Sequence, residues 1–454
     1  MTALLGPDLT PIASTDDLVT YFARGAKTPE RWRIGIEQEK IAVYADGSTP
    51  PFLDDQGKGG IEELLRRLAP KGYEAVREDG HLLALQRGSE SVTVEPGGQV
   101  EFSGPALTTA VACRDSLLTH VDMVSEVAHG LGLTFLGVGL RPWGALDDIP
   151  WLPKRRYGVM RAYLPTRGSL AAHMMKRTAT VQANLDFDSE QTAVEKMRTA
   201  LGVTSIVTAL FAASPISEGK PNGYQSFRAA IWLDTDEARC GLLPFAFDEG
   251  FGFRNYVEWA LDIPLFFVVR RGTYHPAGDF TFRRFMREGF QGERATMGDW
   301  ETHLSTLFPE VRLKRYIEVR GADAGPMDMA VGLAALWRGL LEDAEARRAA
   351  WTLVKGPAFA EREALRREVP RAGLKATLGG RSLKELAQEL VTIARQGLQR
   401  LPDGPADAPL LDPLATRAAS GRTPADDMLA DHQELKGNPA ALVKRWRLRD
   451  AGGR

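Results

Sequence analysis

The feature that most constrains the fold of this chain is a strict alternation of polar and apolar residues in one segment. The segment spans residues 177–187 and reads RTATVQANLDF, with Thr180, Gln182, Asn184 and Asp186 on one parity. Successive side chains of a β-strand point to opposite faces, so the segment predicts a strand with one polar and one apolar face. A strand of this kind belongs in a sheet that packs only one face against the core.

Three other segments repeat the alternation and predict further strands. They read RIGIEQEKIAVYA from residue 33, SVTVEPGGQVEFSG from residue 91 and VRLKRYIEVRG from residue 311. Apolar residues at helical spacing predict helices over 15–30, 59–69, 108–131, 191–213, 328–351 and 382–400. Strands that first pair closely and are then separated by long helices predict an α+β protein, with an antiparallel sheet flanked by helices.

The polar faces of these strands are rich in carboxylates. The residues that parity places on one face are Glu37, Glu39, Glu95, Glu101, Gln182 and Glu318. Any single strand of this kind also fits an ordinary solvated face. Five glutamates gathered on one sheet face, however, would repel each other by more than about 1 kcal/mol per close pair unless cations screened them.

These oxygen donors indicate a hard cation. The seven histidines are scattered singly and the only cysteines are Cys113 and Cys240, so a soft-ligand metal site has no support. Carboxylate and amide oxygens select Mg²⁺ or Mn²⁺. Magnesium held by few carboxylates usually has a phosphate partner, so the acidic, metal-binding face also predicts nucleotide binding.

Basic residues provide candidate contacts to phosphate. They lie in two segments and are Lys154 and Arg156 in the first, and Lys220 and Arg228 in the second. Basic clusters of this kind also fit solvated turns. Arg320 is the sharper candidate, because it lies two residues after Glu318 and so shares the acidic face. An arginine there can neutralise a phosphoryl group during its transfer.

The charge balance limits the possible partners. Lys and Arg number 57 against 59 Asp and Glu, which disfavours a protein dedicated to nucleic acid or to anionic membranes. No apolar run approaches the ~20 residues of a membrane span. The start, MTALLGPDLTP, lacks the pattern of a secretory signal. We therefore expect a cytoplasmic protein with small-molecule partners, without nucleic acid or membrane.

The last part of the chain differs in composition. Residues 401–415, LPDGPADAPLLDPLA, are rich in Pro and Asp and predict a connector. A final helix is expected to begin at Pro424 behind a Thr423 cap, and the basic tail that follows it is expected to fray. The interpretation is a main domain over 1–400, followed by connector, final helix and basic tail over 401–454.

Several longer motifs occur in a fixed order along the chain. They include RWRIGIEQEK, VEPGGQVEFSG, LPKRRYGVMRAYLP, RTATVQANLDF, SPISEGKPNG and LFPEVRLKRYIEVRGADAGP. From about residue 15 to about 435, the chain resembles the plant-type glutamate–cysteine ligases, a family shared with several bacterial lineages. The resemblance implies a catalytic domain over 1–400 that is similar to glutamine synthetase. It also implies synthesis of γ-glutamylcysteine from glutamate, cysteine and ATP with Mg²⁺, through a γ-glutamyl phosphate, as the first step of glutathione biosynthesis.

The resemblance assigns roles to individual residues. The acidic residues of the sheet face would surround the metal ions, and Glu318 and Arg320 would serve phosphoryl transfer. Arg228 matches an arginine that holds the carboxylate of the glutamate substrate. Arg156 and Arg320 match basic residues that face the phosphates or the γ-carboxylate.

Two positions depart from the family pattern. Phe266 stands where plant-type enzymes carry a tyrosine near the amino-acid pocket, which leaves open an acceptor amine other than cysteine. Cys113 matches a cysteine of a regulatory disulfide in plant enzymes, but Val331 occupies the partner position, so we expect no redox switch. Both cysteines also fit small buried apolar residues.

Two alternatives stay open beside the formation of γ-glutamylcysteine. The first is a γ-glutamyl ligase that uses another amine or feeds another thiol pathway, such as that of ergothioneine. The second is a non-catalytic binding protein that keeps the amino-acid pocket. The carboxylates argue against the second, since a non-catalytic protein gains nothing from their repulsion. A monomer or a weak homodimer is expected.

Overall fold

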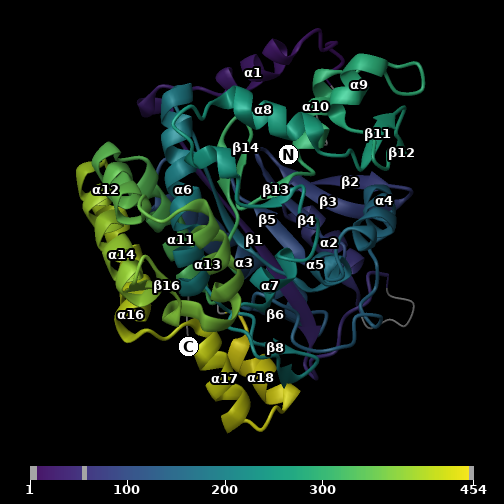
Figure 1. Cartoon of the computed structure of the whole chain (residues 1–454). Coiled ribbons are helices and arrows are strands. Elements are labelled where there is room, and N and C mark those ends of the chain that lie inside the picture. The colour runs from purple at the N-terminus through teal and green to yellow at the C-terminus, as the bar shows by residue number, and fades with distance from the viewer. Residues whose placement is uncertain (1–7, 54–58, 449–454) are drawn as a thin grey trace.

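The sheet at the centre of the structure is antiparallel throughout. The computed structural model describes residues 8–53 and 59–448. A nine-stranded sheet in this part has the order β14-β15-β7-β1-β5-β4-β3-β2, with β6 also paired to β1 (Figure 1). The strands are β1 Ile34–Tyr44, β2 Glu74–Glu78, β3 His81–Arg87, β4 Glu90–Val94, β5 Val100–Ser103, β6 Leu133–Leu136, β7 Val181–Leu185, β14 Val311–Leu313 and β15 Ile317–Val319. The predicted antiparallel sheet in a mixed α and β protein is confirmed.

Strand β1 shows why the sheet has two different faces. Ile34 and Ile36 are buried, whereas Glu37 and Glu39 are only half-buried. Two long helices, α3 Ala110–His129 and α11 Met327–Leu341, pack against β1. Because apolar side chains of β1 and of both helices belong to one core cluster, these helices cover the apolar face and leave the other face to the glutamates.

The remaining helices surround this sheet. They are α1 Thr15–Ala23, α2 Ile61–Leu68, α4 Arg155–Tyr163, α5 Ala171–Arg177, α6 Glu190–Leu210, α7 Phe227–Trp232, α8 Phe253–Asp262, α9 Phe282–Glu288, α10 Met297–Leu304, α12 Ala344–Val354, α13 Phe359–Ala372, α14 Leu383–Arg400, α15 Gly404–Asp407, α16 Asp412–Ser420, α17 Pro424–Glu434 and α18 Pro439–Trp446. In Figure 1, α12, α14 and α16 form a group on one side of the molecule, and α17 and α18 lie at the bottom. Within residues 8–53 and 59–448, every helix is too short or too polar to cross a bilayer.

Four small sheets stand outside the central one in the described residues. They are β8 Ile216–Ser217 with β9 Lys220–Pro221, β10 Cys240–Gly241 with β13 Phe308–Pro309, β11 Phe267–Arg270 with β12 Thr273–Pro276, and β16 Thr377–Leu378 with β17 Arg381–Ser382. The parallel pair β10–β13 matters for the site, because Gly241, Phe308 and Pro309 line a small cavity beside β14 and β15.

Three predicted elements are each divided in the structure. The segment 91–104 consists of β4 and β5, which are joined by a tight turn between Glu95 and Gln99. The segment 311–321 is a hairpin rather than one strand, because the backbone N–H of Lys314 bonds to the carbonyl of Tyr316 and turns the chain between β14 and β15. The predicted helix 328–351 consists of α11 and α12. The break between the two helices is at Asp343, whose side chain accepts a hydrogen bond from Ala346 N and caps α12.

The chain after residue 400 is more helical than predicted. The expected connector forms α15, a 3₁₀ turn and α16, because its prolines occupy the first turns of helices, where a missing N–H costs nothing. Helix α17 begins at Pro424 with a Thr423 capping box, as predicted. The tail also forms a helix, α18, which packs against β6, and its Val443 and Trp446 are buried in a small cluster that also contains Ile41 and Val43 of β1. The division of the chain at residue 400 stays a prediction.

Candidate active site

Glutamates of three neighbouring strands meet on the polar face of the sheet. In the register of β1, Glu39 lies opposite Glu101 of β5, and Glu37 lies opposite Gln182 of β7. Side chains directly opposite each other on antiparallel strands lie ~5 Å apart at their Cβ atoms. Glu95 lies just beyond β4, in the tight turn that leads to β5. The predicted parity of these five residues is therefore correct.

The glutamates of this face bind neutral partners. Asn184 Nδ2 donates to Glu37 Oε1 at 2.8 Å, and the backbone N–H of Thr180 donates to Glu39 Oε2 at 2.9 Å. Thr93 Oγ1 donates to Glu101 Oε2 at 2.6 Å, and the Tyr157 hydroxyl donates to Glu95 Oε1 at 3.3 Å. None of these four carboxylates forms an ion pair with a lysine or arginine of the part that the structure describes.

Burial and mutual repulsion make the ionised state of this cluster costly. Burial, followed by the charges of Glu318 and Glu101, raises the pKa of Glu37. Burial and the charges of Glu101 and Glu95 raise the pKa of Glu39 well above its usual range. Burial and Glu95 likewise raise the pKa of Glu101. The cluster therefore favours any bound cation that offsets the negative charge.

Glu318 has the opposite environment. Arg312 binds both of its carboxylate oxygens, one of them at 2.9 Å, and Lys314 and Arg320 lie at 3.8 and 3.4 Å. Burial acts to raise the pKa of Glu318, but these three cations hold it well below the usual range. Sequence reasoning missed Arg312. Arg312 lies directly opposite Glu318 across the β14–β15 hairpin, and this position could have been predicted only if the turn had been recognised.

The donor chemistry of the acidic face fits a hard divalent cation. The donors are oxygens throughout, and Glu37, Glu39 and Glu101 are half-buried without an ion pair to a lysine or arginine of the described residues. The six predicted ligands are not gathered as one ligating cluster, however. Residues 8–53 and 59–448 contain no group of three or more His, Cys, Asp or Glu close enough to hold one ion together. Glu318 in particular is already bound by Arg312.

Two guanidinium groups close one side of this face. Arg320 Nη1 donates to Gln182 Oε1 at 2.8 Å, and Arg228 Nη2 donates to the carbonyl of Arg320 at 3.0 Å. Both arginines line a small cavity of about 20 Å³, which also contacts Glu310. This volume accommodates one water-sized group. The side chain of Arg228 is buried, and its Nε finds no partner among the described residues.

The start of α4 borders the other end of the acidic face. Lys154 interacts electrostatically with Glu95 and Glu101, and burial together with the neighbouring Arg156 lowers its pKa. The Arg156 guanidinium lies 5.9 Å from the centre of the Tyr157 ring. Helix α4 thus brings two of the predicted phosphate contacts close to the glutamates.

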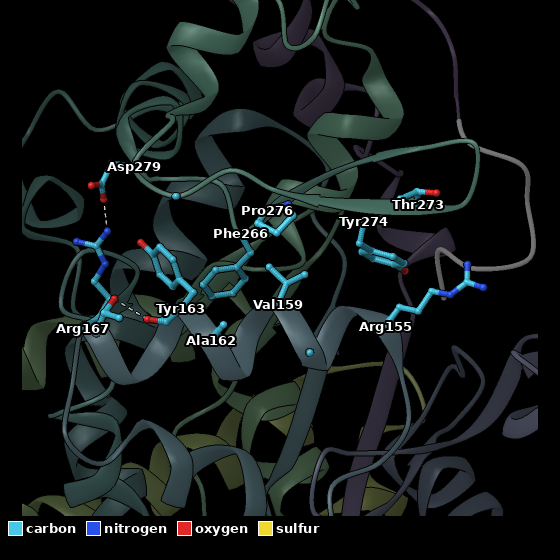
Figure 2. A pocket seen from close by; sticks show the side chains of 13 residues that line it. Arg155, Val159, Ala162, Tyr163, Arg167, Phe266, Thr273, Tyr274, Pro276 and Asp279 are labelled. Atoms are coloured by element: carbon cyan, nitrogen blue, oxygen red, sulfur yellow. Dashed lines mark hydrogen bonds and ion pairs between the residues drawn. The ribbon is translucent and has the colours of Figure 1, made fainter.

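Phe266 lines a separate and larger pocket of about 870 Å³ between α4 and the β11–β12 hairpin (Figure 2). Its ring is 5.1 Å from that of Tyr163, and the guanidinium of Arg239 lies 3.9 Å from its centre. Figure 2 shows Tyr163 beside Phe266 on the same wall of this pocket. A phenolic hydroxyl is therefore present next to the position where the family tyrosine is replaced.

Lys220 and the cysteines lie outside this arrangement. Lys220 is exposed on β9, and no described contact links it to the acidic face, so the structure does not bring it to the predicted phosphate site. Cys113 is buried in α3, with its thiol 3.5 Å from the carbonyl of Ile34, and Val331 is buried in α11. Both cysteines are free.

Comparisons with known proteins identify the family and the fold of this chain. Residues 33–445 match the family described as Glutamate-cysteine ligase family 2. The chloroplastic glutamate–cysteine ligase of Nicotiana tabacum is 44% identical over 418 residues, which cover 91% of this chain and 79% of the relative. Chloroplastic glutamate–cysteine ligase A of Oryza sativa subsp. japonica is 43% identical over 425 residues, 93% of this chain and 85% of the relative. The crystal structure of glutamate–cysteine ligase from Francisella tularensis in complex with AMP shares the fold, with a TM-score of 0.57 at 14% identity, covering 92% of this chain and 89% of that one.

These relatives also overturn one expectation. The enzymes of Nicotiana tabacum, Oryza sativa and Arabidopsis thaliana are all described as chloroplastic, so the expected cytoplasmic location is wrong. The physical reason is that the composition and charge of a globular enzyme do not encode its compartment. The resemblance based on the motifs, by contrast, is confirmed over nearly the whole length: this chain belongs to glutamate–cysteine ligase family 2.

Proposed function

We propose that this protein is an ATP-dependent glutamate–cysteine ligase, which forms γ-glutamylcysteine in the first step of glutathione biosynthesis. The observation that carries the proposal is one sheet face on which half-buried glutamates without ion pairs among the described residues stand beside Arg228 and Arg320. The high identity to plant glutamate–cysteine ligases supports the same reaction. In this reaction the γ-carboxylate of glutamate attacks the γ-phosphorus of ATP and ADP leaves. The amine of cysteine then attacks the acyl carbon, phosphate leaves, and the amine loses a proton.

The acidic face would hold Mg²⁺, or Mn²⁺ in its place. Glu37, Glu39, Glu95 and Glu101 would supply carboxylate oxygens. Gln182 and Glu318, which bind Arg320 and Arg312 in this structure, would flank the ions at the edge formed by β7 and β15. When bound, the ions would neutralise the triphosphate of ATP. The raised pKa values of Glu37, Glu39 and Glu101 support this role, because a cation would offset the repulsion that raises them.

The cations around this face position the substrates. Arg320 would face the transferring phosphoryl group, held by Gln182 at 2.8 Å and by Glu318 at 3.4 Å. Arg228 would bind the carboxylate of glutamate through its guanidinium. Lys154 and Arg156 would contact phosphate or the γ-carboxylate from the start of α4. Such fixed charges act on charge that develops during the reaction and need no reorganisation.

Residues 1–400 would form the catalytic domain, and residues 401–454 would stabilise it. In the described part of this segment, Leu411 and Leu414 belong to the main core, and Trp446 belongs to a second cluster with residues of β1 and β6. We propose a monomer or a weak homodimer, with glutamate, cysteine and ATP as the partners of the site.

A second candidate is a γ-glutamyl ligase with another acceptor amine, or one that feeds another thiol pathway. The observation that favours it is Phe266, which removes a hydroxyl from the wall of the larger pocket. The neighbouring Tyr163 favours cysteine, because its hydroxyl, which accepts from Arg239 Nη2 at 3.2 Å, can still donate a hydrogen bond in place of the lost one.

One experiment separates the two candidates. Release of ADP is measured with glutamate, ATP and Mg²⁺ across a panel of amino acids and amines, and each product is identified by mass. The proposal expects the highest kcat/KM for cysteine and a product with the mass of γ-glutamylcysteine. A different preferred amine would favour the second candidate, and no ADP release with any amine would overturn both.

A further inference from the structure

Asp323 is a buried carboxylate that the proposed reaction does not use. It lies three residues after Arg320 and is 1% exposed. Its Oδ2 accepts hydrogen bonds from the backbone N–H of Ala213 at 2.9 Å and from Ser214 Oγ at 2.6 Å. Its Oδ1 accepts from Ser226 Oγ at 2.8 Å. A single carboxylate thus joins the segment after β15 to both ends of the loop between α6 and α7.

The two serines connect Asp323 by hydrogen bonds to the helix that carries Arg228. Ser226 caps α7, because its Oγ accepts from Ala229 N at 3.0 Å. Ser214 Oγ accepts from the backbone N–H of Arg228 itself at 3.1 Å. A hydroxyl that donates to a carboxylate must turn its lone pairs toward other donors. Asp323 therefore fixes both hydroxyls in the orientation that the first turn of α7 requires.

Asp323 also faces the charge of Arg228. The carboxylate Oδ1 lies 3.9 Å from Arg228 Nη1, and both side chains are buried. The described hydrogen bonds of the guanidinium go to the neutral carbonyls of Arg320 and Gly321, at 3.0 and 3.5 Å. Among the described residues, Asp323 is the only acidic side chain within ion-pair distance of Arg228.

The surroundings leave Asp323 no alternative position. A Cβ at Gly139 would lie 2.6 Å from the Cβ of Asp323, so only glycine allows the two chain segments to approach this closely. The backbone N–H of Gly139 binds the carbonyl of Ala213 at 2.8 Å, next to the loop that Asp323 holds. The carboxylate is therefore enclosed on the side away from Arg228.

From these contacts we infer that Asp323 is the positioning residue of Arg228 and thereby sets the affinity of the enzyme for the carboxylate of its amino-acid substrate. The inference rests on the proposed function, since it takes Arg228 as the group that binds this carboxylate. Asp323 does not touch the substrate. It acts through the cap of α7 and through its charge, both of which hold the guanidinium toward the acidic face.

The test is Asp323→Asn, which keeps the size of the side chain but removes its charge and one acceptor. We expect the KM for glutamate to rise roughly tenfold, as for a misplaced substrate-binding group, with kcat and the KM for ATP within about twofold. A second variant, Ser214→Ala, removes only one link of the network and should raise the glutamate KM by a smaller factor. A third measurement, the shift of the thermal midpoint by glutamate alone, should shrink in both variants.

The matched control is Asp407→Asn. Asp407 is equally buried, pairs with Arg338 and accepts backbone N–H bonds from Ala110 at 3.0 Å and Val111 at 2.8 Å, but it belongs to α15 and holds the start of α3. The Asp407→Asn variant should have a lower thermal midpoint than the unaltered enzyme and an unchanged KM for glutamate. If Asp323→Asn does not fold, Ser214→Ala decides the question alone.

The possible failures are distinguishable. An unchanged glutamate KM in Ser214→Ala and Asp323→Asn, or equal rises for glutamate and ATP, would overturn the positioning role while γ-glutamylcysteine synthesis stands. If the unaltered enzyme forms no γ-glutamyl product, the proposed function fails, and the inference fails with it.

Discussion

Arg312 and Glu318 face each other across the β14–β15 hairpin and form a two-point ion pair inside the protein. The pair leaves Glu318 ionised in a place where burial alone would protonate it. Removing one partner of a buried ion pair leaves an uncompensated charge, which costs more than the pair itself contributes.

The first prediction follows from this pair. Arg312→Met should lower the free energy of unfolding by about 3–5 kcal/mol, measured by urea denaturation at neutral pH. The control is Arg395→Met, because Arg395 and Asp412 form an exposed pair at 2.7 Å. That variant should lose about 1 kcal/mol or less. Equal losses in the two variants would contradict the importance of burial at Glu318.

The second prediction concerns Arg320. Its guanidinium is preorganised by Gln182, so it should stabilise charge on the transferring phosphoryl group rather than ground-state binding. Arg320→Ala should lower kcat by roughly 10²–10³, with a smaller change in the KM for glutamate. Steady-state kinetics with glutamate varied at saturating ATP and cysteine measure both constants. A variant that retains its kcat would remove Arg320 from the chemical step.

The third prediction concerns Arg228. A guanidinium can bind a carboxylate through two parallel hydrogen bonds, and a lysine ammonium cannot copy this geometry. Arg228→Lys should therefore raise the KM for glutamate by roughly 10–100-fold, equivalent to ~1.4–2.8 kcal/mol. The same kinetic series measures it. An unchanged glutamate KM would show that another group binds the substrate carboxylate.

The fourth prediction concerns pH and metal at Glu39. Folding raises its pKa well above the usual value of 4.5, through burial and the charges of Glu101 and Glu95. The folded state thus binds a proton more tightly than the unfolded state, so this group favours folding below pH 4.5 and loses that contribution as the pH rises through the raised pKa. Between pH 4.5 and neutral pH, the free energy of unfolding of the unaltered protein should therefore fall relative to that of Glu39→Gln.

Added Mg²⁺ should reverse this trend at neutral pH, because a bound ion offsets the same repulsion. The measurement is urea denaturation across the pH range, with a chelator and with Mg²⁺. Activity should disappear with the chelator and return with Mg²⁺ or Mn²⁺. A pH-independent difference between the two proteins, or full activity in excess chelator, would refute the metal-binding role of this face.

The fifth prediction concerns redox control. Burial raises the pKa of both Cys113 and Cys240 to about 12, so almost no reactive thiolate exists at neutral pH. Reductants and mild oxidants should leave the initial rate and the apparent size unchanged, as followed by the activity assay and by gel filtration. A reversible loss of activity on reduction would show that a disulfide is present in solution.

The sequence predicted the two faces of each strand well and the chain reversals poorly. Alternation alone placed Glu37 and Glu39 on one face of β1 and Gln182 on the polar face of β7, because a side-chain period of two leaves one choice of face; the register that brings Gln182 opposite Glu37 appears only in the structure. The β14–β15 hairpin was missed because its turn, Lys314 to Tyr316, contains no Gly, Pro, Asn or Asp and preserves the parity of the residues around it. Arg312 was therefore overlooked.

The basic candidates show a second limit of the sequence. Lys154 and Lys220 both lie in segments that contain several basic residues. In the structure, Lys154 interacts electrostatically with Glu95 and Glu101, whereas Lys220 is exposed on β9. Local composition does not predict which of these two segments packs against the sheet. The role of Asp323 was equally hidden, because its partners Ser214 and Ser226 lie about a hundred residues earlier in the chain.

Strand β7 joins two halves of the site that are far apart in the chain, pairing with β1 on one side and β15 on the other. Until β15 has paired with β7, Arg320 cannot reach Gln182, and the glutamates of β1 lack the cations on one side of the face. Pairing between such distant segments is an intrinsically slow event in folding. A chain in which β15 has not paired with β7 therefore lacks the contact between Arg320 and Gln182, and we expect it to be inactive.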